Sequence, residues 1–258
     1  MKPLYVRGAD TRVELDAPAL KIRVPEKSDA WLPLRRISRV ISATQVGWST
    51  EALLACAGEG ISVSFLADDG RVVARVTGQP SERDELRQRL TDLLDRADWR
   101  DSYEVWLSGM EQMASRSVAR RARFAASDIP LPRELQRALR AQATDQGLLT
   151  EYESVGRRLH GLLRSLVTQH LAEAGLGPEW SGWSELDLGG DFCRILFWDF
   201  RLARLAWLNA RRRTHLPAIP SDIEVTAFFE NRSARTGQLC QGLVNRLHHW
   251  LIDQYRWR

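Results

Sequence analysis

One acidic side chain stands on an otherwise apolar face of a predicted helix, where a carboxylate needs a chemical or structural task. A helical wheel places Asp199 among Ile195, Leu202, Ala203 and Ala206, with Arg194, Arg201 and Arg204 on roughly the opposite side. Burying an unpaired charge costs several kcal/mol, so Asp199 must be paired, hydrogen-bonded or protonated. A structural role, in which Asp199 caps a neighbouring helix or pairs with a buried arginine, is the hypothesis we favour, and metal binding is the alternative.

Glu111 is a parallel case on a helix expected at about 103–125. The wheel places it beside Leu107, Ala114, Val118 and Ala122. From the residues alone, the expected role of Glu111 is that of an ion-paired or solvent-facing glutamate of the helix surface.

Arginine supplies almost all of the positive charge. Of 37 basic residues, the lysines are Lys2, Lys21 and Lys27 alone. The planar guanidinium suits phosphate contact, although a GC-rich genome would enrich arginine equally well. Placement therefore has to decide between these explanations.

Two arginine groups are placed where phosphate contact is natural. Arg116, Arg120 and Arg123 are spaced i, i+4, i+7 and form a stripe on the side of their helix away from Glu111. Arg211, Arg212 and Arg213 end the helix that carries Asp199, where positive charge also complements the helix dipole. Together the stripe and the cluster predict contacts with the DNA backbone.

Ten tryptophans are many for this length. Most are expected to anchor the core or a subunit interface. Trp183 lies in a predicted loop and is the candidate for stacking on an unpaired base.

Several function classes are disfavoured. Neither a GxxxxGK[ST] nor a GxGxxG phosphate loop occurs, which argues against nucleotide hydrolysis. His248 and His249 are adjacent and point about 100° apart on a helix, so they are not a metal-binding pair. The three cysteines are far apart and lack a CxxC pairing. No run of about 18 apolar residues and no secretory leader occur, so we expect a cytoplasmic protein without a membrane partner.

The elements that position these residues fall into two classes. Residues 1–80 show the alternation of short strands, with expected strands at 4–6, 12–15, 20–24, 61–66 and 72–76. Ser49 or Thr50 caps a short helix that stops at Gly58, and Asp68-Asp69-Gly70 predicts a hairpin turn.

Residues 81–258 show helical spacing throughout. Leu86, Leu90, Leu93 and Leu94 follow a capping sequence at Ser81, and further helices are expected at about 103–125, 133–143, 148–174, 193–213 and 233–256. The sequence therefore predicts an α+β protein with a small N-terminal β domain (1–80) followed by a larger all-α domain (81–258).

Residues 32–78 resemble a stretch of the CRISPR-associated Cas1 family, the integrases that insert new spacers. The shared order is a strand, a glycine turn, a short helix and the strand ISVSFL leading into a hairpin. The long helix LHGLL to LAEAGLGP, then Gly182, Phe197-Trp198-Asp199 and Arg211-Arg212, are similar to the family's helical half. This resemblance implies dimerisation through the β domain, DNA binding and work with the small protein Cas2.

The resemblance also implies a site that holds Mg²⁺ or Mn²⁺ through a glutamate, a histidine and an acid. Here Ser184 stands where the histidine is expected, and Leu202 replaces the second of two acids spaced three apart, of which Asp199 is the first. Glu111 and Asp199 remain as candidate metal ligands, with Glu151 and Glu153 as weaker candidates for the glutamate. Too few ligands remain for a tight site built by the protein.

We therefore expect a Cas1-like subunit of spacer acquisition that binds double-stranded DNA and is catalytically impaired. One alternative is an active integrase that recruits Glu111, Asp199 and a displaced acid, Asp187 or Asp191, around Mg²⁺ or Mn²⁺. Another is a structural paralogue that pairs with an active Cas1 subunit. Either a homodimer or a heterodimer fits these hypotheses.

Overall fold

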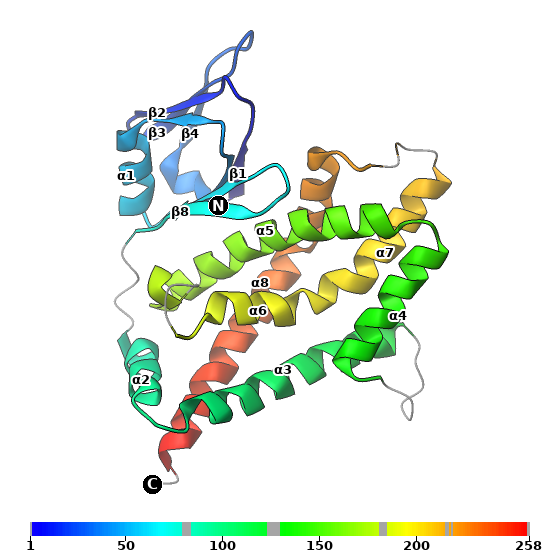
Figure 1. Cartoon of the computed structure of the whole chain (residues 1–258). Coiled ribbons are helices and arrows are strands. Elements are labelled where there is room, and N and C mark those ends of the chain that lie inside the picture. The colour runs from blue at the N-terminus through cyan, green and yellow to red at the C-terminus, as the bar shows by residue number, and fades with distance from the viewer. Residues whose placement is uncertain are drawn as a thin grey trace. The chain divides into compact units, whose positions relative to one another are not determined.

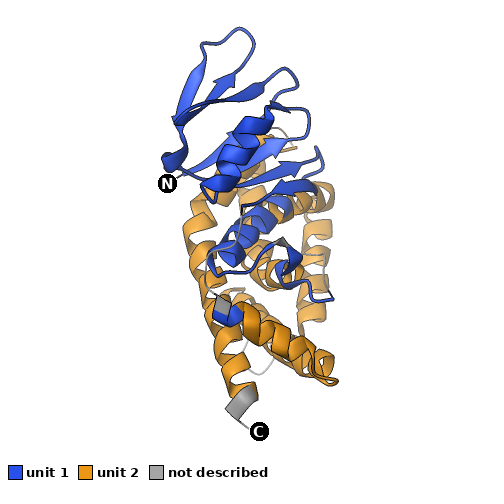
Figure 2. Cartoon of the chain, turned by 90° about the vertical axis from the view of Figure 1, so that its left-hand side faces the viewer, with its two compact units in different colours: residues 1–86, 161–189 blue, residues 87–160, 190–258 orange. Residues whose placement is uncertain are grey.

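The computed structural model describes residues 2–78, 84–122, 130–180, 185–214, 217 and 219–256. The chain forms two compact units (Figure 2). Unit 1 comprises residues 1–86 and 161–189, and unit 2 comprises residues 87–160 and 190–258. Each unit is therefore built from two stretches of the chain.

Unit 1 contains two four-stranded sheets (Figure 1). In the first, of order β1-β5-β7-β8, β5 pairs in parallel with β1 and β7, and β8 is antiparallel to β7. In the second, of order β4-β3-β2-β6, β3 is antiparallel to β2 and β4, and β6 is parallel to β2. The strands are β1 (Lys2–Val6), β2 (Arg12–Asp16), β3 (Ala19–Arg23), β4 (Ala30–Pro33), β5 (Ile37–Ala43), β6 (Gly47–Trp48), β7 (Ser62–Leu66) and β8 (Val72–Val76).

Local sequence explains two features of this region. Helix α1 (Thr50–Gly58) begins where the Ser49 side chain accepts a hydrogen bond from the backbone N–H of Ala52. The turn between β7 and β8 has Gly70 at φ +86°, a conformation that glycine adopts at little cost. The predicted cap and the predicted hairpin are both confirmed, whereas the strand prediction omits β4, β5 and β6.

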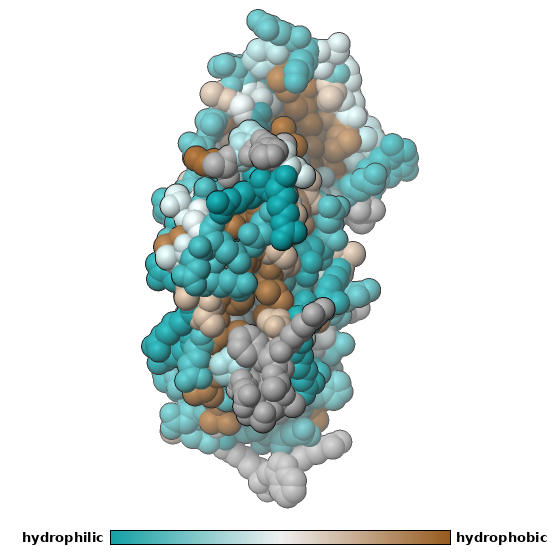
Figure 3. All heavy atoms as spheres, turned by 90° about the vertical axis from the view of Figure 1, so that its right-hand side faces the viewer, coloured by the Kyte–Doolittle hydropathy of each residue, from teal (hydrophilic) through white to brown (hydrophobic). Residues whose placement is uncertain are grey.

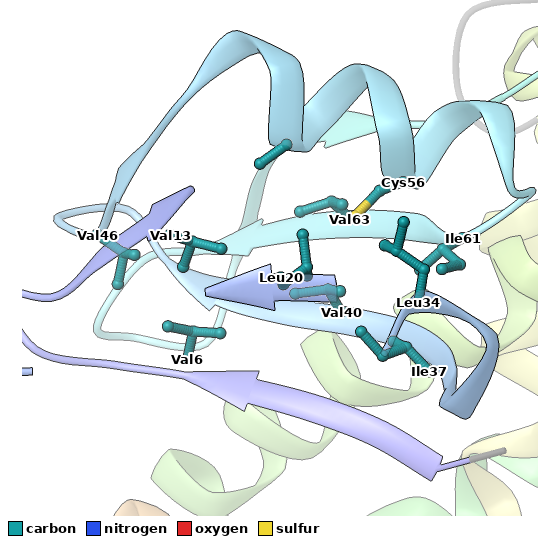
Figure 4. Packing of buried hydrophobic residues seen from close by; sticks show 11 residues of the cluster. Val6, Val13, Leu20, Leu34, Ile37, Val40, Val46, Cys56, Ile61 and Val63 are labelled. Carbon is teal, nitrogen blue, oxygen red and sulfur yellow. The ribbon is translucent and has the colours of Figure 1, made fainter. Parts of the chain in front are cut away.

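The sheets and α1 enclose the apolar core of this part of unit 1 (Figure 4). Val13 and Leu20 of one sheet, Val40 and Val63 of the other, and Cys56 of α1 are all fully buried. The second half of helix α5 also belongs to unit 1, where the Ser165 hydroxyl lies 3.1 Å from the Ser64 hydroxyl of β7.

The rest of the chain is helical, which confirms the predicted fold class. The longer helices are α2 (Asp84–Leu94), α3 (Trp99–Arg121), α4 (Pro132–Asp145), α5 (Leu149–Glu173), α6 (Leu188–Leu196), α7 (Trp198–Arg213) and α8 (Asp222–Arg256). No described helix is long and apolar enough to cross a membrane. On the face drawn in Figure 3, hydrophilic side chains predominate.

The helices differ most from the sequence prediction between α6 and α8. The helix expected at 193–213 is divided at Phe197, where the N–H of Phe200 bonds to the Phe197 carbonyl at 3.0 Å in an i, i+3 pattern. The last helix begins at Asp222 rather than near 233. Ser221 and Glu224 explain this start, because the serine hydroxyl accepts from the Glu224 N–H while the glutamate accepts from the Ser221 N–H.

Candidate functional site

Asp199 lies in the first turn of α7 and is the centre of a charged cluster in unit 2. Its side chain is 6% exposed. Arg121 Nη1 lies 2.8 Å from Oδ1, Arg232 Nη2 lies 2.6 Å from Oδ2, and Arg235 Nε lies 3.5 Å from Oδ1. The carboxylate is therefore held by arginines from two other helices, as expected for a buried charge.

The sequence of those helices explains the cluster. Arg121 is the last residue of α3, and Arg232 and Arg235 are one turn apart on α8, so they present neighbouring side chains. Burial alone would raise the pKa of Asp199, but the hydrogen bonds and charges of Arg232 and Arg121 outweigh burial and lower that pKa below its ordinary value. Asp199 is therefore a carboxylate at neutral pH.

This arrangement does not fit a divalent metal ion. A cation of that kind needs several anionic or neutral oxygen and nitrogen donors, whereas the Asp199 oxygens already face three guanidinium groups. Across the described ranges, no three His, Cys, Asp or Glu side chains come together as a possible metal site. Leu202 is half-buried and offers no donor, and Ser184 falls outside the described residues.

Glu111 lies beside this cluster but does not join it. Its Oε1 accepts a hydrogen bond from the Trp198 indole at 3.2 Å, and its Oε2 lies 3.7 Å from Arg194 Nε. The Arg201 guanidinium stands 4.7 Å from the centre of the Trp198 ring. Glu111 therefore holds the indole that precedes Asp199 and lies close to one arginine of α6.

Three of the other acidic candidates, Glu153, Asp191 and Asp187, have basic or phenolic partners. Glu153 pairs with Arg140 at 2.6 Å. Asp191 accepts a hydrogen bond from the Tyr103 hydroxyl at 3.0 Å. In unit 1, Asp187 pairs with Arg164 at 2.7 Å.

Comparison with known proteins identifies the family. The family described as CRISPR associated protein Cas1 matches residues 4–155, more than half of the chain. The chain belongs to the Cas1 family. As a member, the protein has a role in CRISPR adaptation. No curated protein matches its sequence.

Solved structures agree with the Cas1 fold. The chain is similar to a Cas1 protein from Thermotoga maritima, with a TM-score of 0.72, 12% identity and 97% of both chains covered. It is similar to a casposase bound to integration product, with a TM-score of 0.68, 12% identity and 98% and 91% covered. It also matches a chain of a Cas6-RT-Cas1–Cas2 complex, with a TM-score of 0.64 and 13% identity, covering 96% of this chain and 35% of that one.

The predicted DNA-binding stripe of this Cas1 protein is solvent-facing where it is described. Arg116 and Arg120 are both exposed on α3. Within the described ranges, neither forms a side-chain ion pair or hydrogen bond. Arg123 and Trp183 lie outside the described residues, so their predicted roles stay predictions.

The three arginines that end α7 have different surroundings. Arg211 is buried, pairs with Glu224 at 2.7 Å and donates to the Pro217 carbonyl at 2.9 Å. Hydrogen bonds from Arg211 and from Ser221 lower the pKa of Glu224 to about 2. Arg212 donates to the Gln146 carbonyl, and Arg213 is exposed. Arg211 thus joins the end of α7 to the start of α8, and its role in binding DNA stays a prediction.

Sequence reasoning missed the partners of Asp199 and misplaced Arg204. The wheel put Arg204 on the polar side of the helix, but it is 3% exposed and its guanidinium lies 3.5 Å from the centre of the Tyr152 ring. The wheel fails because α7 is covered on more than one side. No local signal links Asp199 to Arg232 or Arg235, which lie on a different helix.

Proposed function

We propose that this Cas1-family protein binds double-stranded DNA in CRISPR adaptation and does not catalyse metal-dependent strand transfer at Asp199. The observation that carries the proposal is the cluster of Arg121, Arg232 and Arg235 around that carboxylate. A divalent ion brought to the same oxygens would meet three positive charges at hydrogen-bond or ion-pair distance. DNA is supported as the partner by the exposed arginines of α3 and by the similarity to a casposase bound to integration product.

The partners of this role are also proposals. The similar chain in a Cas6-RT-Cas1–Cas2 complex supports Cas2 and further Cas1 subunits as candidates. A heterodimer with an active Cas1 subunit would supply the chemistry that this chain lacks. A homodimer would instead serve as a DNA-binding scaffold.

Strand transfer tests the catalytic part. The purified protein is incubated with a duplex donor and a supercoiled target in Mg²⁺ or Mn²⁺, alone and with Cas2. We expect no integration product. Integration that is lost in both Asp199→Asn and Glu111→Gln, with both variants folded, would instead establish the active-integrase alternative.

Salt-dependent binding tests the DNA part. Affinity for a blunt duplex should fall steeply as salt rises, and the double variant Arg116→Gln/Arg120→Gln should lower the slope of log K against log salt by up to about 1.8 in magnitude, about 0.9 for each phosphate that is no longer neutralised. Arg137→Gln, an exposed arginine on α4, is the matched control and should leave the slope unchanged. Absence of duplex binding at low salt would favour the structural paralogue.

A further inference from the structure

A cavity of about 290 Å³ opens in unit 2 beside Asp199. Helices α3 and α8 form its two long walls, and α6 and the start of α7 close it. Among the lining residues, Met110, Met113 and Arg121 come from α3, and Arg235, Leu239, Gly242 and Arg246 come from α8. The volume is at the lower end of the range for small-molecule sites.

The charge of the cavity is positive. Arg121, Arg235 and Arg246 line it, against one carboxylate, Asp199. Asp199 is almost fully buried and has Arg121 and Arg232 as its two closest partners, whereas Arg235, whose Nε lies 3.5 Å from Oδ1, is 57% exposed and Arg246 is also exposed. Anions are therefore the ligands that the charge of this cavity favours.

The walls between those arginines are apolar and open to solvent. Met113 and Leu239 are 42% and 40% exposed, which is high for such large apolar side chains. Arg246 Nη1 lies 3.5 Å from Met113 Sδ, so a guanidinium of α8 reaches the opposite wall. Apolar surface placed next to charge suits a ligand that has an apolar part and an anionic part.

The methionines indicate what kind of apolar part fits. The chain has three methionines, and Met110 and Met113 both line this cavity. Thioether sulfur makes favourable contacts with aromatic rings, and guanidinium groups stack on them. An aromatic ring carrying a phosphate is the chemistry that matches both features.

We propose that this cavity binds a nucleoside monophosphate unit, with its base against Met113 and Leu239 and its phosphate between Arg235 and Arg246, without a divalent metal ion. The unit could come from a free nucleotide or from the phosphorylated end of a nucleic-acid strand. The fixed guanidinium groups supply the positive charge that a metal ion would otherwise provide.

A glycine in the wall gives a direct test. A Cβ added at Gly242 would meet no atom within 4 Å, so Gly242→Leu should fill the cavity without disturbing the helix. Gly109 on α3 has the same open surroundings but does not line the cavity, so Gly109→Leu is the matched control. Arg246→Gln removes one cation of the cavity, and Arg137→Gln removes one elsewhere.

Binding of dAMP to the full-length protein is measured by calorimetry in EDTA, with deoxyadenosine as the ligand without phosphate. We expect dAMP to bind at least about tenfold more tightly than deoxyadenosine, and Arg246→Gln to weaken dAMP by about tenfold, as for the loss of a charge-assisted hydrogen bond. Gly242→Leu should abolish binding, while Gly109→Leu and Arg137→Gln should bind as the unsubstituted protein does. Added Mn²⁺ should not increase the affinity.

A short single-stranded oligonucleotide, with and without a 5′-phosphate, distinguishes the two sources. Preference for the phosphorylated strand, lost in Gly242→Leu, with no binding of dAMP, would assign the site to strand ends. The proposal is overturned if neither dAMP nor the strand binds, or if Gly242→Leu binds them unchanged. A blunt duplex tests the proposed DNA-binding function separately, because its binding should not depend on Gly242.

Discussion

Arg232 Nη2 lies 2.6 Å from Asp199 Oδ2 and 3.4 Å from the Asp199 carbonyl oxygen, so one guanidinium of α8 holds both the side chain and the backbone of the first turn of α7. Because this carboxylate is buried, removing its charge should cost more than breaking a surface ion pair, since the arginines around it would be left without their anion.

Asp199→Asn should lower the free energy of unfolding by about 3 kcal/mol at pH 7, because it leaves Arg232 and Arg121 without their anion. The folded-state pKa of Asp199 is lowered, so the stabilisation is present above the ordinary aspartate pKa and is lost as the pH falls through the folded-state pKa. The difference between the proteins should therefore shrink in acid. Urea unfolding at several pH values measures it.

The control for that series is Asp145→Asn, an exposed aspartate at the C-terminal end of α4. A negative charge there opposes the helix dipole, so its removal should be neutral or slightly stabilising. Equal effects of the two substitutions would contradict the role given to the Asp199 cluster.

Arg211→Gln and Arg213→Gln should show which arginine at the end of α7 contributes to the stability of the fold. Arg211 is buried against Glu224, so its loss should lower the melting temperature by several degrees. Arg213 is exposed, and its substitution should leave the melting temperature unchanged. Thermal unfolding followed by circular dichroism checks both, and a stable Arg211→Gln protein would show that the Glu224 contact contributes little.

Gly161→Ala should destabilise unit 1 by about 2 kcal/mol, the cost of forcing a methyl group into a packed contact. The added Cβ would overlap the carbonyl oxygen of Gly70 in the turn between β7 and β8. Gly242→Ala has open surroundings and should stabilise its helix by about 1 kcal/mol. Urea unfolding measures the free energy of unfolding of both variants. Equal values for the two would indicate that the turn between β7 and β8 moves away from the added methyl group freely.

Cys56 should be inert to thiol reagents in the folded protein. Burial raises the pKa of its thiol to about 11, so about one molecule in a thousand carries the reactive thiolate at pH 8. Labelling with a disulfide reagent, followed by peptide mapping, should show modification of Cys56 after addition of denaturant and not before. Fast labelling of the native protein would mean that α1 opens readily.

The parts of the fold that could be predicted are those with local signals. Ser49 as a cap and Asp68-Asp69-Gly70 as a turn act through residues a few positions away, and both are confirmed. The start of α8 had a local signal as well, because Ser221 and Glu224 have the spacing of a capping box. Apolar spacing, which becomes clear only further along α8, predicted a later start instead.

For the candidate site, the sequence could predict that Asp199 is paired but not which residues pair with it. An isolated carboxylate among apolar residues indicated that Asp199 must be paired, and it is. Which arginines pair with it depends on how α3 and α8 pack against α7, 78 residues before it for Arg121 and 33 after it for Arg232. Arg204 was wrongly predicted to lie on the polar side of the helix. A helical wheel with one buried face does not describe a helix that is covered on several sides.

Two ion pairs with α7 hold helix α8 at positions about two turns apart. Arg211 pairs with Glu224, and Asp199 pairs with Arg232. A helix held in this way cannot roll about its own axis unless both attachments break. The wall formed by Leu239 and Arg246 is therefore already in position before any molecule arrives. Association with that wall should follow a single exponential in stopped-flow mixing, at a rate proportional to ligand concentration and with no plateau.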